Sequence, residues 1–547
     1  MAHARSFTIL LALALLAAAA AGPAPAAPGD HVWSRGFDTE TLADITPDGE
    51  VTVAGMFYGT VDFGGGPLTP SNPFGGDMFV ARFDANGNHV FSFAVVGGQG
   101  HGVNAVRADP AGGVYVMGRI YSGSVDFGGG PLAANNDFYV VRYDEDGNHL
   151  FSGLHGNVEL ADAEADAQGL MIVGATRSTA DFGGGPLTTA GDTDALIARL
   201  DGAGNHVFSA IYGDAYGQYA RAVGLDAGGG SVVAFQIAGT IDFGGGPLVP
   251  AGFGLALVEF DATGAHVRSD LIDGDFTSGI TYNVHLDVKD DGGFVVAGEL
   301  HGAADLGGGP LYTAGNTDVF VALFGTDGTH LFSASYGSTS YQVVNSVTFA
   351  PDDAIVLSGN FVNDLDFGGG VLSAGPTTPK LFLARLDAGG AHEFSTTYEG
   401  PSGAYSLITR TKAAGALLLE ASSSPDLDLG GGPLGPYYSF LGVLEGSGTV
   451  PSSVTDGDTP AVPVGVAAYP NPFNPATKLA FTLDHRGEVE VLVHDLRGAL
   501  VARLFRGELD AGAHEVQWRA EGVPSGVYLA TVRAGAARRT TPVTLVK

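Results

Sequence analysis

The sequence predicts an all-β protein, a seven-bladed β-propeller closed by an N-terminal strand and followed by a small Ig-like β-sandwich. The motif Asp-Phe-Gly-Gly-Gly-Pro-Leu, or a close variant, occurs seven times at intervals of 55 to 64 residues. A period of this size indicates a repeat architecture. The chain also contains 86 glycines among 547 residues, more than twice the usual share of about 7%, which is typical of a turn-rich chain. The aspartates of the motif are Asp62, Asp126, Asp181, Asp242, Asp305, Asp366 and Asp428.

The first 27 residues have the three-part layout of a secretory signal peptide. Arg5 precedes an apolar run from Phe7 to Ala21, and a segment rich in Ala and Pro follows. We expect cleavage near Ala24–Ala27. A membrane anchor is the alternative, but the run is shorter than the roughly 20 residues that a span needs. We therefore expect an exported protein with no transmembrane segment in the mature chain.

Each repeat between Asp30 and Glu445 contains four predicted strands, which are short, rich in β-branched and aromatic residues, and bounded by Gly, Asp and Asn turns. No helical periodicity interrupts them. Four antiparallel strands in each of seven repeats predict seven propeller blades. In the repeat at 214–272, the strands are expected within 219–229, 231–240, 255–261 and 266–272.

The ends of the array predict that the ring is closed. The seventh repeat stops near Glu445 without the His-x-Phe-Ser strand that ends the others, whereas residues 30–37 match that strand at 88–95. Pairing the first strand with the last blade removes exposed sheet edges, and an open array would gain nothing from this offset. The His-x-Phe-Ser strands are then outermost, and the Gly-Gly-Gly loops share a face with the loops between blades.

These repeats resemble the secreted bacterial β-propeller repeat family, in which Asp-Phe-Gly-Gly-Gly-Pro-Leu, Asp-x-Phe-Val-Ala-Arg-x-Asp and Gly-Asn-His-x-Phe-Ser recur about every 60 residues. The resemblance covers Asp30–Glu445. It implies the architecture and no single activity.

The composition changes after Glu445. Residues 446–466 are rich in Gly, Ser, Pro and Thr and carry no repeat motif, so we predict a linker. Residues 467–547 contain alternating apolar positions such as Val489, Val491 and Val493, which predict a small Ig-like β-sandwich.

Four segments of residues 467–547 carry a further resemblance, namely Tyr469–Pro475, Val493–Gly498, Pro524–Tyr528 and the final Lys547. With these segments, residues 467–547 resemble the type A C-terminal sorting domain of the bacterial type IX secretion system. The family implies transport to the periplasm by the general export pathway and then recognition by the outer-membrane secretion machinery. It also implies an extracellular or outer-membrane surface location, often with removal of the sorting domain.

One departure from this family is Trp518-Arg519-Ala520, where Trp-Asp-Gly is usual. It leaves the subtype open. The Ig-like modules of flagellar hook-capping proteins and an ordinary Ig-like spacer are the alternatives.

The bulk properties exclude several kinds of site. The formal net charge is -34, from 59 acidic and 25 basic residues, and so acidic a chain is not expected to bind nucleic acid. The chain has no cysteine, which excludes disulfides and thiolate chemistry. It contains neither a His-Glu-x-x-His nor a Gly-x-Ser-x-Gly motif, and we assign no catalytic residue.

The triple glycine is predicted to be a structural turn. A phosphate loop needs a Lys followed by Ser or Thr after its glycines, whereas Pro67 and Leu68 follow here. We expect the aspartate to accept hydrogen bonds from the glycine amides, and Phe63 and Leu68 to pack between blades.

Metal and cofactor sites are not expected. The turn Asp144–Asn148 begins like a calcium loop, but His155 occupies the twelfth position, where an acidic ligand is needed. Structural calcium on the acidic surface stays open as an alternative. The seven repeated histidines lie one per blade, too far apart to share a metal. They are His31, His89, His149, His206, His266, His330 and His392.

The loops between blades vary from repeat to repeat and combine tyrosines with amide side chains, which suits sugar or peptide binding. We therefore predict a secreted or cell-surface, non-enzymatic propeller that binds a glycan or protein ligand. The alternatives are a carbohydrate-active enzyme with carboxylates in the channel and a purely structural or adhesive surface protein. The candidate ligand-binding residues are Tyr216, Gln218, Tyr219, Tyr282, His285, Tyr341, Gln342 and Asn345; Gln99, His101 and Asn104 lie in a further loop of this kind.

Overall fold

The computed structural model is all-β throughout the residues that it describes. The chain divides into two compact units, residues 1–448 and 449–547. Among the described residues no helix is long and apolar enough to cross a membrane. The predicted signal peptide, Tyr282 and most of the predicted linker lie outside the described residues. The structure describes residues 31–71, 76–97, 100–272, 283–398, 406–411, 416–425, 427–429, 434, 436–445, 463–483, 487–494, 500–509, 512–520, 522–534 and 537–547.

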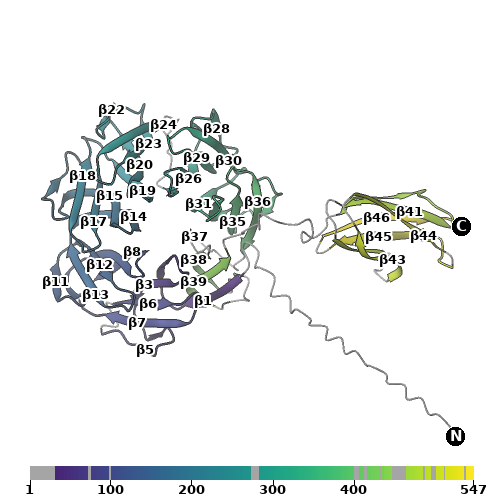
Figure 1. The fold of residues 1–547 in the computed structure, drawn as a ribbon, viewed down its shortest axis with the longest axis horizontal. Helices are drawn as coiled ribbons and strands as arrows, with labels where there is room; N and C mark the ends of the chain where they lie inside the picture. Colours follow the sequence, from purple (N-terminus) through teal and green to yellow (C-terminus); the bar gives the residue numbers. More distant parts are fainter. Residues whose placement is uncertain are drawn as a thin grey trace, which may run out of the picture. The chain divides into compact units, whose positions relative to one another are not determined.

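Within its described residues, the first unit contains seven antiparallel sheets, each with a path of four strands (Figure 1). Sheet 1 contains β2 (Thr41–Ile45), β3 (Val51–Phe57), β6 (Asp77–Phe83) and β7 (His89–Val95). Sheet 2 contains β8 (His101–Ala108), β9 (Val114–Ile120), β12 (Asp137–Tyr143) and β13 (His149–Leu154). Sheet 3 contains β14 (Gly156–Asp166), β15 (Gly169–Ala180), β17 (Asp194–Asp201) and β18 (His206–Tyr212), with β16 (Leu187–Thr188) paired to β15.

The remaining sheets follow the same order. Sheet 4 contains β19 (Tyr219–Leu225), β20 (Ser231–Ala238), β23 (Phe253–Phe260) and β24 (His266–Ile272). Sheet 5 contains β25 (Val284–Val288), β26 (Phe294–Leu300), β29 (Asp318–Phe324) and β30 (His330–Tyr336). Sheet 6 contains β31 (Gln342–Phe349), β32 (Ile355–Phe361), β35 (Lys380–Leu386) and β36 (His392–Tyr398). Sheet 7 contains β37 (Ser406–Thr411), β38 (Ala416–Pro425), β39 (Pro436–Glu445) and the N-terminal β1 (His31–Phe37).

The sheets are arranged around a common centre, with the first strand of each repeat nearest to it (Figure 1). In sheets 1 to 6 the hydrogen-bonded order follows the sequence. In sheet 7 the fourth strand is β1, whose residues pair with β39 from His31 opposite Leu444 to Phe37 opposite Ser439. The units are consistent with propeller blades.

The core of the first unit lies between sheets. Each of seven apolar clusters joins two sheets that follow each other in sequence, except that one joins sheet 7 to sheet 1. In that cluster Trp33 and Leu441 of sheet 7 pack with Phe79 of sheet 1. Since every sheet is covered on two sides by its neighbours, strands such as β6 are buried at every position.

A small hairpin occupies the Gly-Gly-Gly motif in five repeats, and Figure 1 shows labelled hairpin strands such as β5, β11 and β22 on the outside of the unit. In the first repeat Phe63 and Leu68 belong to the core between sheets 7 and 1. The hairpins are β4 (Val61–Asp62) with β5 (Pro67–Leu68), β10 (Gly123–Asp126) with β11 (Pro131–Ala134), β21 (Ile241–Asp242) with β22 (Pro247–Leu248), β27 (Ala303–Asp305) with β28 (Pro310–Tyr312), and β33 (Asp364–Leu365) with β34 (Leu372–Ser373).

Each of the three glycines has its own physical reason. Asp62 accepts hydrogen bonds from the amides of Gly64 at 2.8 Å and Gly66 at 3.1 Å. These two glycines have φ of 110° and 108°, a region that side chains disfavour. At Gly65 a Cβ would lie 2.3 Å from Cε1 of His89, because the imidazole packs directly on the turn.

The same turn recurs around the unit. The aspartates Asp126, Asp181, Asp242, Asp305 and Asp366 each accept two glycine amides, and the middle glycine of each copy faces a histidine. Asp428 begins the seventh copy, whose glycines lie outside the described residues.

The sequence predicted that the Gly-Gly-Gly loop shares a face with the loops between blades, and this prediction is wrong for the tip of the hairpin. The loop leaves β3 at Phe57, which pairs with Asp77, but its tip contacts His89, which pairs with Phe83 at the opposite end of the sheet. The hairpin therefore runs along the outer edge of the sheet instead of remaining on the face that carries the loops between sheets.

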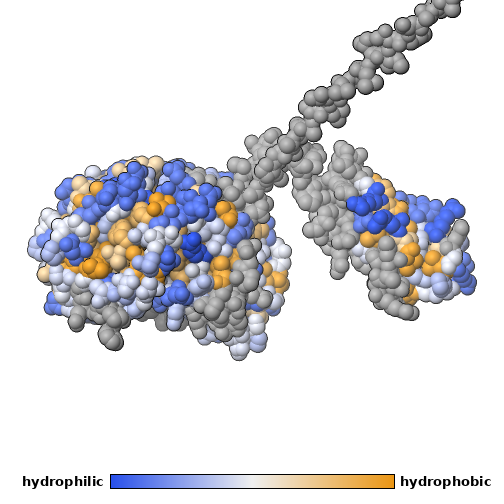
Figure 2. All heavy atoms as spheres, turned by 90° about the horizontal axis from the view of Figure 1, so that it is seen from below, coloured by the Kyte–Doolittle hydropathy of each residue, from blue (hydrophilic) through white to orange (hydrophobic). Residues whose placement is uncertain are grey.

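The repeated histidines act within this turn. His89 Nε2 lies 3.0 Å from Ser92 Oγ, which accounts for the spacing of the His-x-x-Ser motif. The residue after each of these histidines is exposed. Apolar residues are accordingly distributed among hydrophilic ones on the side of the unit seen in Figure 2. The exposed apolar residues at this position are Val32, Val90, Leu150, Val207, Val267 and Leu331.

The second unit contains two antiparallel sheets around one core. One sheet has the order β40 (Pro463–Tyr469), β41 (Ala476–Leu483), β44 (Gly512–Arg519), and the other has β43 (Leu500–Leu509), β42 (Gly487–His494), β45 (Gly526–Ala534), β46 (Ala537–Leu545). Trp518 of the first sheet packs with Tyr528 of the second and with Phe473. Strand β40 begins at Pro463, inside the range predicted to be linker.

Candidate functional site

We call the face on which the first strand of each repeat begins and the second strand ends the loop face. Thr41, the first residue of β2, pairs with Gly55 near the end of β3. The loops that join successive sheets therefore open on the same face as the ends of the second strands.

A polar cavity of about 370 Å³ lies among the innermost strands, and we call it the channel cavity. Every first strand contributes to its wall, and Asn283, just before β25, and Glu420 of β38 also line it. Polar groups predominate, and the charged lining residues are Arg107, Asp162, Arg221, Arg410 and Glu420.

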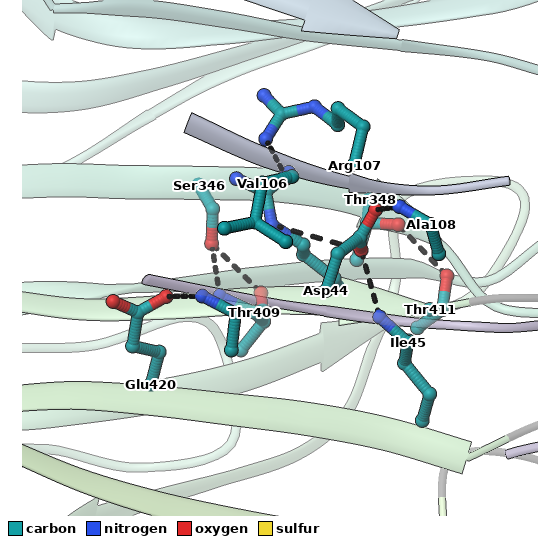
Figure 3. Close-up of polar contacts among 12 residues, drawn as sticks. Asp44, Ile45, Val106, Arg107, Ala108, Ser346, Thr348, Thr409, Thr411 and Glu420 are labelled. Atoms are coloured by element: carbon teal, nitrogen blue, oxygen red, sulfur yellow. Dashed lines mark hydrogen bonds and ion pairs between the residues drawn. The ribbon is translucent and has the colours of Figure 1, made fainter. Parts of the chain in front are cut away.

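Aspartates beside this cavity join neighbouring sheets. Asp44 accepts the amide of Ile45 at 2.9 Å and the amide of Ala108, in the next sheet, at 2.7 Å (Figure 3). Asp162 and Asp287 make the same pair of contacts, with Val223 at 3.1 Å and Phe349 at 2.7 Å in the following sheet. Both oxygens of each of these carboxylates are thus engaged by main-chain amides, in charge-assisted hydrogen bonds that join neighbouring sheets.

Arg107 is also held in place. Its guanidinium, 5% exposed, donates to the Val106 carbonyl at 2.8 Å and to Asp162 Oδ1 at 2.5 Å, and it also donates to the Ala163 carbonyl. These contacts occupy the guanidinium within the inner wall, so Arg107 links sheets 2 and 3.

Of the two carboxyl groups that line the channel cavity among the described residues, Glu420 accepts fewer hydrogen bonds than Asp162. It lies on β38 and is 9% exposed. Its Oε2 accepts the Ala43 amide at 3.2 Å, and Figure 3 shows its other oxygen without a drawn partner. Burial raises the pKa of Glu420 to about 7, although Arg410 and Arg107 act in the opposite direction.

His285 has the opposite shift. Burial lowers the pKa of its imidazole to about 4, so the ring is neutral near pH 7. The ring bonds the main chain of Val344, and its Nε2 has no hydrogen-bond partner among the described residues. Across the described part of the chain, no group of three or more metal-ligating side chains is gathered.

A second cavity, of about 980 Å³, opens on the loop face between sheets 7 and 1, and we call it the seam cavity. It shares Leu42, Ile408 and Glu420 with the channel cavity. Its wall is held by Thr41 Oγ1, 2.8 Å from Ser439 Oγ, which donates to the Thr39 carbonyl at 2.7 Å. Tyr58 and Tyr438 line it and are 59% and 65% exposed.

Three of the four candidate tyrosines predicted from the sequence are described by the structure, and these three lie on the loop face. Tyr216 and Tyr341 are 63% and 55% exposed, in the loops that precede β19 and β31. Tyr219 is half-buried, with the Arg221 guanidinium carbon 4.3 Å from its ring centroid. Tyr282 lies outside the described residues.

The candidate amide and histidine residues divide into two groups. Gln218 and Gln342 are fully buried and donate to the carbonyls of Ala238 at 2.9 Å and Val362 at 3.1 Å. They hold the loops that carry the tyrosines. His285 and Asn345 line the channel cavity instead, as does Asn104.

Three tyrosines on the loop face, together with Glu420, were not predicted. Tyr58 and Tyr121 both follow directly after a second strand, and this shared repeat position could have identified them. Tyr438 lies near the start of β39. Glu420 directly follows the apolar run Ala416–Leu419 in β38, and its place beside Ala43 depends on a contact across 377 residues.

Comparison with known proteins concerns mainly the second unit. Residues 467–546 match the family described as "Secretion system C-terminal sorting domain". The match confirms the predicted sorting domain and marks the chain as a protein exported by the type IX secretion system to the cell surface or the extracellular space. No curated protein matches the sequence.

Similar solved structures include a eukaryotic initiation factor, with 12% identity and a TM-score of 0.33 over 74% of this chain and 92% of that one. PorZ, described as an essential bacterial surface component of the type IX secretion system of Porphyromonas gingivalis, has 13% identity and a TM-score of 0.24 over 93% and 75%. A puromycin hydrolase has 12% identity and a TM-score of 0.30 over 71% and 59%. Similarity at this level says nothing about function.

Proposed function

We propose that this exported protein is a non-enzymatic, closed seven-bladed β-propeller that binds a glycan through tyrosines on its loop face. The pairing of β1 with β39 and the apolar cluster shared by sheets 7 and 1 support the closed ring. The second unit acts as an Ig-like, type A sorting domain that the outer-membrane secretion machinery recognises.

The observation that carries the binding function is the set of exposed tyrosines on one face. They are 53% to 65% exposed, although rings of this size are usually largely buried. A tyrosine offers a flat apolar surface for a sugar ring and a hydroxyl for its polar groups. The set comprises Tyr58, Tyr121, Tyr216, Tyr341 and Tyr438.

The contacts in the channel favour binding over catalysis. A glycosidase needs two carboxyl groups that are free to act on the substrate. Asp44 and Asp162 each accept one main-chain amide from the following residue and one from the neighbouring sheet. Glu420 is the exception. Among the described residues that line the channel cavity, the other carboxylate is Asp162, which main-chain amides already hold.

A glycan array probed with the purified full chain tests the proposal. We expect binding to a defined class of polysaccharide, and we expect Tyr216→Ala with Tyr341→Ala to weaken it at least about tenfold. The Tyr→Phe variants at both positions serve as controls, because they keep the ring. Undiminished binding by the alanine double variant would show that these tyrosines do not bind the glycan. Binding to proteins and to no glycan would overturn the proposed class of ligand.

The export role is tested separately. Deletion of residues 467–547 should leave the propeller in the periplasm, because the sorting domain is the part that matches the secretion family. Equal release of the truncated and complete chains would contradict the role.

A further inference from the structure

The seam cavity carries charge of one sign only. Its charged lining residues among the described part of the chain are Asp38, Glu40 and Glu420, and no Lys, Arg or His lines it there. The adjoining channel cavity, by contrast, is lined by groups of both signs, the three arginines Arg107, Arg221 and Arg410 with Asp162 and Glu420. The two cavities therefore present different charges to a ligand, even though they meet at Glu420.

Glu420 gives the seam cavity a buried carboxyl group with unused capacity. The side chain is nine-tenths buried, and only Oε2 has a hydrogen-bond partner, the Ala43 amide at 3.2 Å. The second oxygen has no partner among the described residues. Arg410 and Arg107 already favour the charged form of this carboxyl group without donating to it, and an ammonium group in the cavity would donate a hydrogen bond to the second oxygen.

The tyrosines add a second kind of cation contact. Tyr58 and Tyr438 line the cavity from sheets 1 and 7, and both are largely exposed. The face of an aromatic ring attracts an ammonium group within about 6 Å of its centroid. Met56 and Val61, both partly exposed, supply apolar surface to the cavity, which suits the carbon frame of an organic cation better than a bare metal ion.

We infer that the seam cavity is a subsite for an organic ammonium group, and that the glycan bound on the loop face is an amino-sugar polymer with free amino groups. This inference rests on the proposed glycan-binding function. The Glu420 carboxylate would accept hydrogen bonds from the ammonium, Asp38 and Glu40 would add attraction at the entrance, and the two tyrosines would flank it. An acidic polysaccharide would be repelled here.

A lysine side chain carries the same ammonium group, so the experiment must separate the two sources. The probes are hexaglucosamine, its fully N-acetylated form and hexalysine, each titrated calorimetrically into the purified full chain. N-acetylation removes the charge while keeping the sugar rings. Hexalysine keeps the charge and removes the rings.

We expect hexaglucosamine to bind at least about tenfold more tightly than its N-acetylated form. Glu420→Gln should abolish this preference, so that the two sugars bind the variant with equal affinity. The glutamine keeps the shape and the acceptor for Ala43, so the fold should persist. Tyr58→Ala should reduce the preference, and Tyr58→Phe should retain it. Asp146→Asn, an exposed charge removal in a turn outside both cavities, is the matched control and should have no effect.

The outcomes distinguish the inference from the proposed function. Equal binding of the two sugars would overturn the ammonium subsite and leave glycan binding intact. Binding of hexalysine through Glu420, without binding of either sugar, would support the ammonium subsite and overturn the glycan. Failure of all three probes would overturn both.

Discussion

The outer rim and the loop face of the first unit are built on opposite principles. On the rim, the same contacts recur from sheet to sheet, as in the glycine turns of Asp62 and Asp126 with their histidines. On the loop face, corresponding positions differ, so that Tyr216 and Tyr341 stand where other repeats have other residues. The repeated segment thus maintains the architecture, whereas the varied segment provides the capacity to bind.

The largest expected effect concerns the repeated framework. Arg82 is fully buried and donates to Thr52 Oγ1 at 2.9 Å and, across to sheet 2, to the carbonyls of Gly113 at 3.1 Å and Glu145 at 3.3 Å. Arg82→Met should reduce the free energy of unfolding by about 3–5 kcal/mol, because these carbonyls lose a charged donor. Urea denaturation measures it. Arg177→Met is the control and should cost under about 0.5 kcal/mol, since Arg177 is 54% exposed.

A second effect comes from Glu420 of sheet 7, a buried carboxyl group that belongs neither to the repeated contacts of the rim nor to the exposed tyrosines of the loop face. Its folded-state pKa of about 7 exceeds its ordinary value of 4.5, so the folded chain holds this proton more tightly than the unfolded chain. This contribution to stability is present below about pH 4.5 and is lost as pH rises through about 7. Arg107 and Arg410 favour its charged form, and Asp44 opposes it.

Glu420→Gln removes this dependence. We expect the variant to gain on the order of 3 kcal/mol relative to the natural chain between about pH 4 and pH 8. Denaturation of both proteins at the two pH values isolates the effect, because all other groups titrate alike. A constant stability difference would contradict the raised pKa.

The glycine turn provides a smaller effect on the rim. Gly65→Ala should cost about 2 kcal/mol, because its Cβ would meet the His89 ring at 2.3 Å. In a His89→Ala background the same change should cost much less, since the obstacle has gone. Additive costs in this double-mutant cycle would show that the histidine is not the reason for the middle glycine.

The smallest effect separates two neighbours in one loop. Gln342→Ala should cost about 1–2 kcal/mol, because the Val362 carbonyl and the Ser338 amide lose their partner. Tyr341→Ala should change stability by less than about 0.5 kcal/mol, since the ring is 55% exposed. Thermal unfolding of both variants checks this. Equal losses would mean that the tyrosine also serves the fold.

Sequence reasoning could predict what depends on period and alternation. The strands, their order within each repeat and the partnership of β1 with the last repeat follow from motif spacing. The contact of Gly65 with His89 could not be predicted in this way, because it depends on the hairpin turning back along the sheet. The two motifs looked independent in the sequence although they form one structural unit.

The candidate site was harder to predict because exposure is decided by the path of each loop. Gln218 and Tyr216 are two residues apart, yet the more polar Gln218 is fully buried and the aromatic Tyr216 is 63% exposed. Glu420 follows an apolar run, Ala416–Leu419, that gives no sign of a cavity, and its position beside Ala43 exists only after sheets 7 and 1 meet.

The most direct test of the division between rim and loop face measures binding and stability on the same preparations. We expect the Tyr216→Ala, Tyr341→Ala double variant to unfold at the natural temperature and to lose glycan binding. We expect Gly65→Ala to unfold at a lower temperature and, while folded, to bind as the natural chain does. Retained binding by the tyrosine variant together with lost binding by folded Gly65→Ala would contradict the account.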